Sequence, residues 1–297
     1  MKQKIENHRS LENKAEIAIM RDRINTILRN SEILPSIEAD FQYTFEHIGL
    51  SAPAAQQLCA TVLQHLASGN NVTTNEVNIL EIFKATVIAD GRTILKVLDE
   101  QLSGRAERIA QQVAPYLKGV NGKVIDYGTG DGQVAQLLHD NHSLDITGVD
   151  PRFYPARGVT VPIIQFDGKS IPNITEGTFA AALLTNTFHH ESQNEAIFDE
   201  LDRILAKTGS RIVVIETVPV GLTEEAMLAD KDRTFMNDYL YNRLFHGADV
   251  PVPGTFETPQ QWKERFAKHG WKLHYEEDLG FDQPTIKDRH YLFVFER

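Results

Sequence analysis

The 297-residue sequence predicts an α/β protein: a doubly wound, mostly parallel sheet with an antiparallel C-terminal strand, preceded by a helical N-terminal cap. Two observations predict this class. Residues 1–118 carry apolar side chains at helical spacing, without strand-like alternation. From Gly122 onward, short runs rich in Val and Ile alternate with helical segments, which is typical of βαβ units. We therefore expect a cap or dimerisation region over 1–118 and a sheet domain over 119–297.

The periodicity of apolar residues and the residues typical of helix starts predict helices in the cap. Ser51 precedes an Ala-Pro pair, and Thr73 and Glu76 have the spacing of a capping box, so we expect helices to begin at both places. The apolar residues of the first helices recur every three or four positions: Ile17, Met20, Ile24, Ile27 and Leu28, then Leu58, Val62 and Leu66.

The sheet domain contains seven expected strands. The helices between them are expected near 131–140 and 194–206, and a further helix begins at Thr258-Pro259-x-Gln261. The stretch 219–257 is too long for a simple connection, so we expect it to form a lid over a site. The strands are expected near 123–127, 145–149, 162–166, 179–185, 210–216, 271–279 and 290–296.

Composition narrows the class of protein. A formal charge of −11 argues against a nucleic-acid binder, because affinity for a phosphate backbone comes from clustered Lys and Arg. Cys59 is the single cysteine, which excludes a disulfide within the sequence and fits a reducing compartment. The polar start MKQKIENHRS lacks the apolar core of a signal peptide, and no stretch approaches a membrane span. We expect a cytoplasmic protein without a membrane or nucleic-acid partner.

The stretch VIDYGTGDG, residues 124–132, places glycines directly after the first strand, where a Rossmann-like sheet meets its ligand. The G-x-G-x-G spacing departs from the dinucleotide fingerprint, which weakens a nicotinamide interpretation. Asp126, Asp131 and Asp150 surround the turn, and Asp150 stands where an acid holds ribose hydroxyls. Carboxylates would repel a pyrophosphate and attract an ammonium and a sulfonium. S-adenosylmethionine carries both cations.

Four motifs in order, VIDYGTGDG, ITGVDP, IIQFDGKSIP and FAAALLTNTFHH, resemble those of class I S-adenosylmethionine-dependent methyltransferases over about 119–297. The resemblance implies S-adenosylmethionine as cofactor. An Asn-Pro-Pro-Tyr signature is absent, so we expect a small-molecule acceptor, such as one from secondary metabolism. The resemblance also implies nine cofactor contacts: Asp126, Gly128 and Gly130 beside the methionine portion, Asp150 at the ribose, Phe166, Asp167 and Gly168 around the adenine, and Thr185 and Asn186 near the sulfur.

Candidate catalytic and substrate residues follow the fourth strand. With an ordinary pKa of about 6.5, His189 or His190 could remove a proton from an acceptor, while methyl transfer itself requires no metal. Tyr127 departs from the family pattern and either packs or narrows the pocket near the sulfur. Candidate substrate contacts are Phe188, Glu216 and, in two aromatic stretches that could equally be core, Tyr43, Tyr239, Tyr241, Arg243 and His246.

Three functions remain open on the sequence. The first is methyl transfer, in which proximity and alignment supply much of the rate. The second resembles azetidine-2-carboxylate synthases, which close the aminocarboxypropyl chain of the same cofactor on its own amine and release methylthioadenosine. The third is a catalytically inactive cofactor-binding interaction module. A homodimer through the helical cap is a further expectation.

Overall fold

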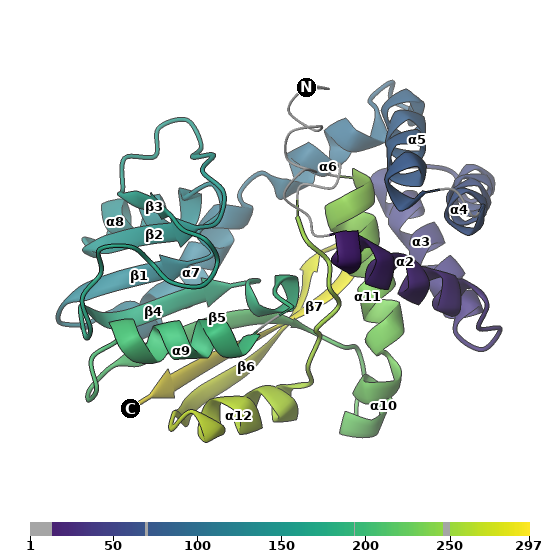
Figure 1. Ribbon diagram of the computed structural model, residues 1–297. Coiled ribbons are helices and arrows are strands. Elements are labelled where there is room, and N and C mark those ends of the chain that lie inside the picture. The colour runs from purple at the N-terminus through teal and green to yellow at the C-terminus, as the bar shows by residue number, and fades with distance from the viewer. Residues whose placement is uncertain (1–13, 69–70, 193, 246–249) are drawn as a thin grey trace.

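The computed structural model describes residues 14–68, 71–192, 194–245 and 250–297 (Figure 1). Its centre is one seven-stranded sheet in the order β3-β2-β1-β4-β5-β7-β6, with helices on both faces and a helical unit to one side. β7 is antiparallel to both of its neighbours, and the other pairings are parallel. The predicted fold class is therefore confirmed. Among the described residues, no helix combines the length and the apolarity needed to cross a membrane.

The five central strands form where Val and Ile runs are buried on both faces, as a covered parallel sheet requires. Their bounds agree with the predicted ones to within two residues. In register, Asp126 lies beside Gly148 of the second strand and Leu183 of the fourth. The strands are β1 Lys123–Tyr127, β2 Ile146–Asp150, β3 Ile163–Gln165, β4 Phe179–Thr185 and β5 Arg211–Val218.

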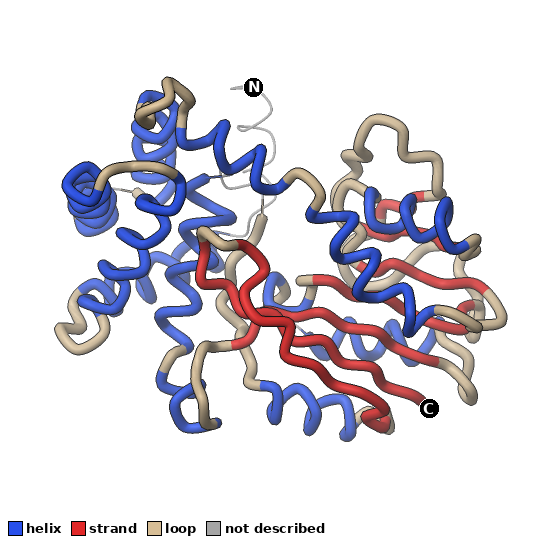
Figure 2. Tube along the Cα trace, turned by 180° about the vertical axis from the view of Figure 1, so that it is seen from behind, coloured by secondary structure: helices blue, strands red, loops and turns tan. Residues whose placement is uncertain are grey.

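The last two strands, β6 Lys272–Gln283 and β7 Ile286–Glu296, are longer than predicted. Their tip extends beyond the sheet toward the helical unit (Figure 2). Tyr43 donates its hydroxyl hydrogen to the Pro284 carbonyl at 3.0 Å, and the Lys287 ammonium lies 2.8 Å from Asp40. The sequence hid this extension because the polar residues at the tip are ordered by contacts with distant helices and have no apolar alternation of their own.

Two helical layers cover the sheet. α7 Arg105–Leu117 and α8 Gln133–His142 pack on one face, and α9 Asn194–Ile204 and α12 Pro259–Lys268 pack on the other. The predicted start of α12 is confirmed by the capping box of Thr258 and Gln261. Because α7 shares the core of the sheet, the two units divide before α7, ahead of the expected division at residue 118.

A second core fills the helical unit, and two distant segments build it. The insertion expected at 219–257 contributes buried side chains such as Phe235 and Phe256 to the same cluster as the N-terminal helices. The insertion is thus an integral part of this unit (Figure 1). Its elements are α2 Lys14–Leu28, α3 Leu34–Ile48, α4 Ala52–Ala67, α5 Val72–Ala85, α6 Ile94–Leu102, α10 Glu224–Ala229, α11 Lys231–Tyr239 and the π-helical η3 Leu240–Phe245.

The expected start of α5 is wrong in its detail. Asn71 caps the helix by accepting the Thr73 backbone N–H, and Glu76 does not complete a capping box. Glu76 is instead 1% exposed and accepts hydrogen bonds from the Arg243 Nε at 2.9 Å and the Tyr239 hydroxyl at 3.1 Å. A long-range ion pair has taken the side chain that local spacing assigned to the cap.

We expect Glu76→Ala to lower the free energy of unfolding by about 3–5 kcal/mol, because it leaves the buried Arg243 charge without its carboxylate. Glu81 offers a matched control on the same helix, since it pairs with Lys84 at a largely exposed position. Glu81→Ala should cost less than about 1 kcal/mol. Urea unfolding followed by circular dichroism measures both. Equal losses in the two variants would contradict the importance assigned to the buried pair.

Candidate active site

The glycine turn after β1 packs tightly against neighbouring residues at Gly128 and has open space beside Gly130. Gly128 and Gly130 have φ values of +78° and +59°, which favour glycine. A Cβ on Gly128 would lie 2.6 Å from the Thr187 hydroxyl oxygen, so the turn packs tightly against the segment after β4. A Cβ on Gly130 would meet, among the described atoms within 4 Å, the Tyr154 hydroxyl at 3.4 Å. The backbone at Gly130 is therefore accessible to a ligand.

Asp126 is a buried carboxyl group with one unused oxygen. Its Oδ2 accepts the Thr129 hydroxyl hydrogen at 2.6 Å, and its Oδ1 has no hydrogen-bond partner within the described part of the chain. Burial raises the pKa of Asp126 to about 7; the Thr129 hydrogen bond opposes this rise and the Asp150 charge adds to it. Such a group suits a ligand that brings a positive charge or a donor.

Asp150 braces the glycine turn, a role that the sequence did not reveal. Its Oδ2 accepts the Gly130 backbone N–H at 2.9 Å and its Oδ1 accepts that of Arg152 at 2.8 Å. Burial raises the pKa of this carboxyl group, while the two backbone hydrogen bonds oppose the rise. Each oxygen keeps a second lone pair, so the carboxylate can still accept hydrogen bonds from a ligand.

The residues after β3 are divided between core and surface. Phe166 is buried against Tyr127, with ring centroids 5.3 Å apart. Asp167 is exposed, and its Oδ1 accepts the backbone N–H groups of Lys169 and Ser170, which lowers its pKa. Gly168 follows with a positive φ. Asp167 thus shapes this loop, and its second oxygen remains for a ligand.

Tyr127 is 2% exposed and packs in the core between the sheet and α9. Burial raises the pKa of its phenol, and the described residues offer its hydroxyl no hydrogen-bond partner. Its neighbour in the strand, Asp126, points to the opposite face, because side chains alternate along a strand. The position supports packing, the first of the two roles expected for Tyr127.

Asn186 ends β4, directly after Thr185, in a left-handed conformation with φ of +53°. Its backbone N–H donates to the Ile215 carbonyl at 2.7 Å, which fixes the turn. The buried side-chain Oδ1 has no partner among the described residues. Unpaired acceptors on Asp126 and Asn186 thus follow neighbouring strands of the sheet, which is the arrangement expected around a ligand that supplies donors.

Glu216, a candidate substrate contact, is fully buried in β5. Its Oε1 accepts the backbone N–H groups of Thr187 and Phe188, both at 2.7 Å, and its Oε2 lies 2.6 Å from the His189 Nδ1. Glu216 therefore holds the short helical turn η2, Phe188–His190, at the end of β4.

Phe188, also a candidate substrate contact, has its ring facing the core. It is fully buried and packs on Phe198, with ring centroids 5.2 Å apart, and on Trp262, at 5.0 Å. A large apolar side chain after a strand is as typical of core as of a pocket wall. Here the apolar faces of α9 and α12 determine the outcome.

The two histidines of η2 have different environments. Burial lowers the pKa of His189, but the charge and hydrogen bond of Glu216, with the charge of Asp238, outweigh burial and raise it to about 9. His190 donates its Nδ1 hydrogen to the Pro251 carbonyl at 2.8 Å. Burial and the adjacent His189 lower the pKa of His190 well below its ordinary value, so its imidazole is neutral and its Nε2 carries a lone pair.

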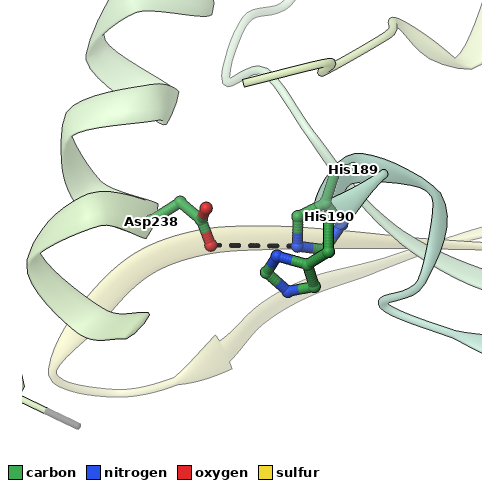
Figure 3. A group of neighbouring side chains, drawn as sticks. All are labelled: His189, His190 and Asp238. Carbon is green, nitrogen blue, oxygen red and sulfur yellow. Dashed lines mark ion pairs between the residues drawn. The ribbon is translucent and has the colours of Figure 1, made fainter. Parts of the chain in front are cut away.

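Asp238 joins this group from α11 and was missed by the sequence analysis (Figure 3). Its Oδ1 lies 3.8 Å from the His189 Nε2 and accepts the Asn242 side-chain N–H at 2.6 Å. Burial raises the pKa of Asp238 to about 7, with the His189 charge opposing. Asp238 is the first residue of the stretch DYLYNRLFH, in which the aromatic residues, and not the aspartate, were expected to contact a substrate.

A hollow of about 90 Å³ lies beside this group. His190 and Pro251 form part of its wall, and Ile17 and Met20 of α2 complete it with apolar side chains. The hollow therefore opens where the sheet meets the helical unit, which is a common place for a small-molecule site.

The aromatic residues expected around a substrate mostly lie elsewhere. Tyr239 and Arg243 belong to the buried Glu76 group, and Tyr43 is half-exposed at the hairpin tip. Tyr241 packs against the helical core, where burial raises the pKa of its phenol. Helical spacing alone could not separate core from wall, and the structure places these four with the helical unit. His246 lies outside the described residues.

No curated protein matches the chain in sequence. The solved structures that are similar to this chain include three of methyltransferases. A geranyl diphosphate methyltransferase in complex with S-adenosylmethionine is 14% identical, with 69% of this chain and 90% of that chain covered and a TM-score of 0.49.

The other two structures have a similar sequence identity, coverage and TM-score. The geranyl diphosphate C-methyltransferase of Streptomyces coelicolor is 14% identical over 64% of this chain and 77% of that chain, with a TM-score of 0.46. The 1,6-didemethyltoxoflavin-N1-methyltransferase of Burkholderia thailandensis is 13% identical over 65% and 78%, with a TM-score of 0.46.

The family comparison covers more than half of the chain. The family described as "Methyltransferase domain" matches residues 98–276, a range that includes the glycine turn, η2 and α11. The expected resemblance to class I methyltransferases, with S-adenosylmethionine as cofactor, is confirmed by this match. The chain belongs to the methyltransferase domain family.

Proposed function

We propose that this protein transfers the methyl group of S-adenosylmethionine to a small molecule. The observation that carries the proposal is that two buried acceptors at the ends of neighbouring strands, Oδ1 of Asp126 and Oδ1 of Asn186, lack partners among the described residues, while the backbone of Gly130 is accessible. The methionine portion of the cofactor brings an ammonium donor and a sulfonium charge to such a place. These oxygens gain their missing partners when the cofactor binds.

The remaining contacts extend along the sheet edge from this point. The ribose hydroxyls would donate to the second lone pairs of Asp150. The adenine would lie beside Phe166 and Gly168, with its amino group donating to the free oxygen of Asp167. The sulfur would lie near Thr185 and Asn186, next to η2. This order follows β1, β2, β3 and β4, whose carboxyl ends meet at one edge.

The chemistry then takes place beside His190. An acceptor atom approaches the methyl carbon in line with the carbon–sulfur bond, at about 3 Å, and forms the new bond with its lone pair. The electrons of the broken bond return to sulfur, which yields S-adenosylhomocysteine. An acceptor that must lose a proton can transfer it to the Nε2 of neutral His190, which borders the hollow. His189, clamped by Glu216, is a positioning residue.

A biosynthetic role, a homodimer and a cytoplasmic location stay predictions. The two alternative activities of the same fold, closure of the cofactor chain and binding without chemistry, are outcomes of the product experiment below.

We expect Asp150→Ala to weaken S-adenosylmethionine binding by about 1–3 kcal/mol, or roughly 5- to 150-fold in Kd, because the ribose loses its acceptors and the glycine turn loses its brace. Asp145 lies exposed just before the opposite end of the same strand, so Asp145→Ala is the matched control and should bind normally. Isothermal titration calorimetry measures both. Normal binding by Asp150→Ala would place the ribose elsewhere.

Cofactor affinity should also depend on pH through Asp126. Its pKa of about 7 means that the cofactor-free protein holds a proton there at pH 6, and the proton must leave before the carboxylate pairs with a cation. Affinity should therefore increase roughly five- to tenfold between pH 6 and pH 7.5. In Asp126→Asn this dependence should disappear. A wild-type protein whose affinity does not change over this range would exclude Asp126 as the cation partner.

The activity itself is tested by products. The pure protein is incubated with S-adenosylmethionine alone and then with a panel of small-molecule acceptors, and mass spectrometry identifies what forms. We expect S-adenosylhomocysteine, and only when an acceptor is present. Methylthioadenosine with a four-membered-ring amino acid, formed without acceptor, would mean cyclisation instead. Cofactor binding without either product would mean an interaction module.

A further inference from the structure

We propose that His189, His190 and Asp238 form a binding site for one divalent transition metal ion at the junction of the two units. The three side chains converge from η2 and α11, and one ligand atom from each lies within 4.8 Å of the others (Figure 3). No metal is expected from the sequence, because neighbouring histidines and an aspartate far along the chain do not form a recognisable ligand motif. The folded chain brings them together.

Both histidines are oriented as metal ligands are. A ligating imidazole normally donates its other N–H to a carboxylate or a backbone carbonyl, which fixes the tautomer and the direction of the ring. His189 has its Nδ1 at 2.6 Å from Glu216, and His190 donates its Nδ1 hydrogen to the Pro251 carbonyl at 2.8 Å. The Nε2 of His189 faces Asp238, and one ring nitrogen of His190 lies within 4.8 Å of the ligand atoms of both neighbours. Each histidine has one of the two partner types that metal sites use.

Asp238 supplies an independent indication. Its carboxyl group is 5% exposed, and its Oδ2 has no hydrogen-bond partner among the described residues. Its Oδ1 faces the His189 Nε2 at 3.8 Å, a separation too long for a hydrogen bond. A buried carboxylate with an unused oxygen is costly unless a cation or a donor completes it. A metal ion would satisfy that oxygen and join Asp238 to both rings.

The local charge has the sign that a cation needs. Two buried carboxyl groups flank His189, with the Glu216 Oε2 at 2.6 Å from its Nδ1 and the Asp238 Oδ1 at 3.8 Å from its Nε2. Carboxylates gathered in a buried region repel one another unless positive charge is added. A divalent ion would supply it at the centre of the group.

The distances allow a site after a small contraction. Metal–nitrogen and metal–oxygen bonds of about 2.0–2.2 Å place neighbouring ligand atoms roughly 3–3.5 Å apart. The present separations, up to 4.8 Å, therefore need movements on the order of 1 Å, which side-chain torsions provide. Two imidazoles and one carboxylate suit zinc or ferrous iron better than magnesium, which prefers oxygen ligands.

The ion would give the proposed methyl transfer a second binding element, one that holds the acceptor. The metal site itself does not depend on the proposed function, and only this role toward the acceptor rests on it. His190 borders the hollow, so an ion bound by its imidazole would lie close to the place proposed for the acceptor and could take an acceptor atom as a further ligand. The substrate class would then be an acceptor with a hydroxyl or carboxylate oxygen that can bind the ion. With the ion bound, the His190 lone pair is a ligand, and the ion takes over its role of making the acceptor reactive.

The test uses the full-length, tag-free protein, stripped with a chelator and titrated with Zn²⁺ by calorimetry. We expect one equivalent to bind, with no competition from excess Mg²⁺. Co²⁺ should give visible d–d absorption of a site with nitrogen ligands. Asp238→Asn and His190→Ala should each weaken Zn²⁺ binding by at least about tenfold. Glu216→Gln, which removes the carboxylate partner of His189, should weaken it less.

His142→Ala is the matched control. His139 and His142 lie one turn apart on the exposed part of α8 and could together bind zinc adventitiously. Replacing His142 removes this pair and should leave Zn²⁺ binding at the proposed site unchanged. The proposal is overturned if Zn²⁺ does not bind, or if binding disappears in His142→Ala and persists in Asp238→Asn. Thermal melting by circular dichroism shows that each variant is folded. Cofactor binding by the metal-free protein is measured separately, so failure of the metal site would leave the proposed function standing.

Discussion

The arrangement of the site depends on one buried carboxylate, that of Glu216. From the fifth strand it accepts two backbone N–H groups of the turn after the fourth strand and also holds the first histidine of that turn. Hydrogen bonds to a charged, water-excluded acceptor are among the stronger ones in proteins. The same turn closes against Gly128 through Thr187, so the cofactor loop and the histidines have a common support. Under the proposed function, this one interaction would position both the cofactor and the acceptor.

The second unit contributes Asp238 to the group that it forms with His189 and His190. α11 belongs to the helical core, and yet it places Asp238 against η2 at the edge of the sheet. The hairpin of β6 and β7 holds the two units together through Tyr43, which donates to the Pro284 carbonyl, and through Lys287, which pairs with Asp40. Under the proposed function, the sheet would bind the cofactor and the added helices would define the second half of the site.

Much of this fold could be predicted from local pattern. The strands with Val and Ile runs, the capped start of α12 and the acids at strand ends are encoded within a few residues of each other. The features that local pattern did not predict depend on partners that lie far away in the sequence. Glu76 has capping-box spacing but pairs with Arg243; Glu216, a candidate substrate contact, holds a backbone turn; Asp238 lies far along the chain from the histidine that it meets. Buried polar residues are placed by tertiary contacts, and periodicity does not report those.

The shared core of the helical unit has a consequence for how the chain is made. The helices α2 to α6 are synthesised first, but they bury apolar faces against Phe235, Phe245 and Phe256, which leave the ribosome about two hundred residues later. Contacts of such long sequence separation form slowly, and the early helices expose apolar surface until then. A chain that stops before residue 230 would therefore lack the apolar side chains that complete the core of the helical unit.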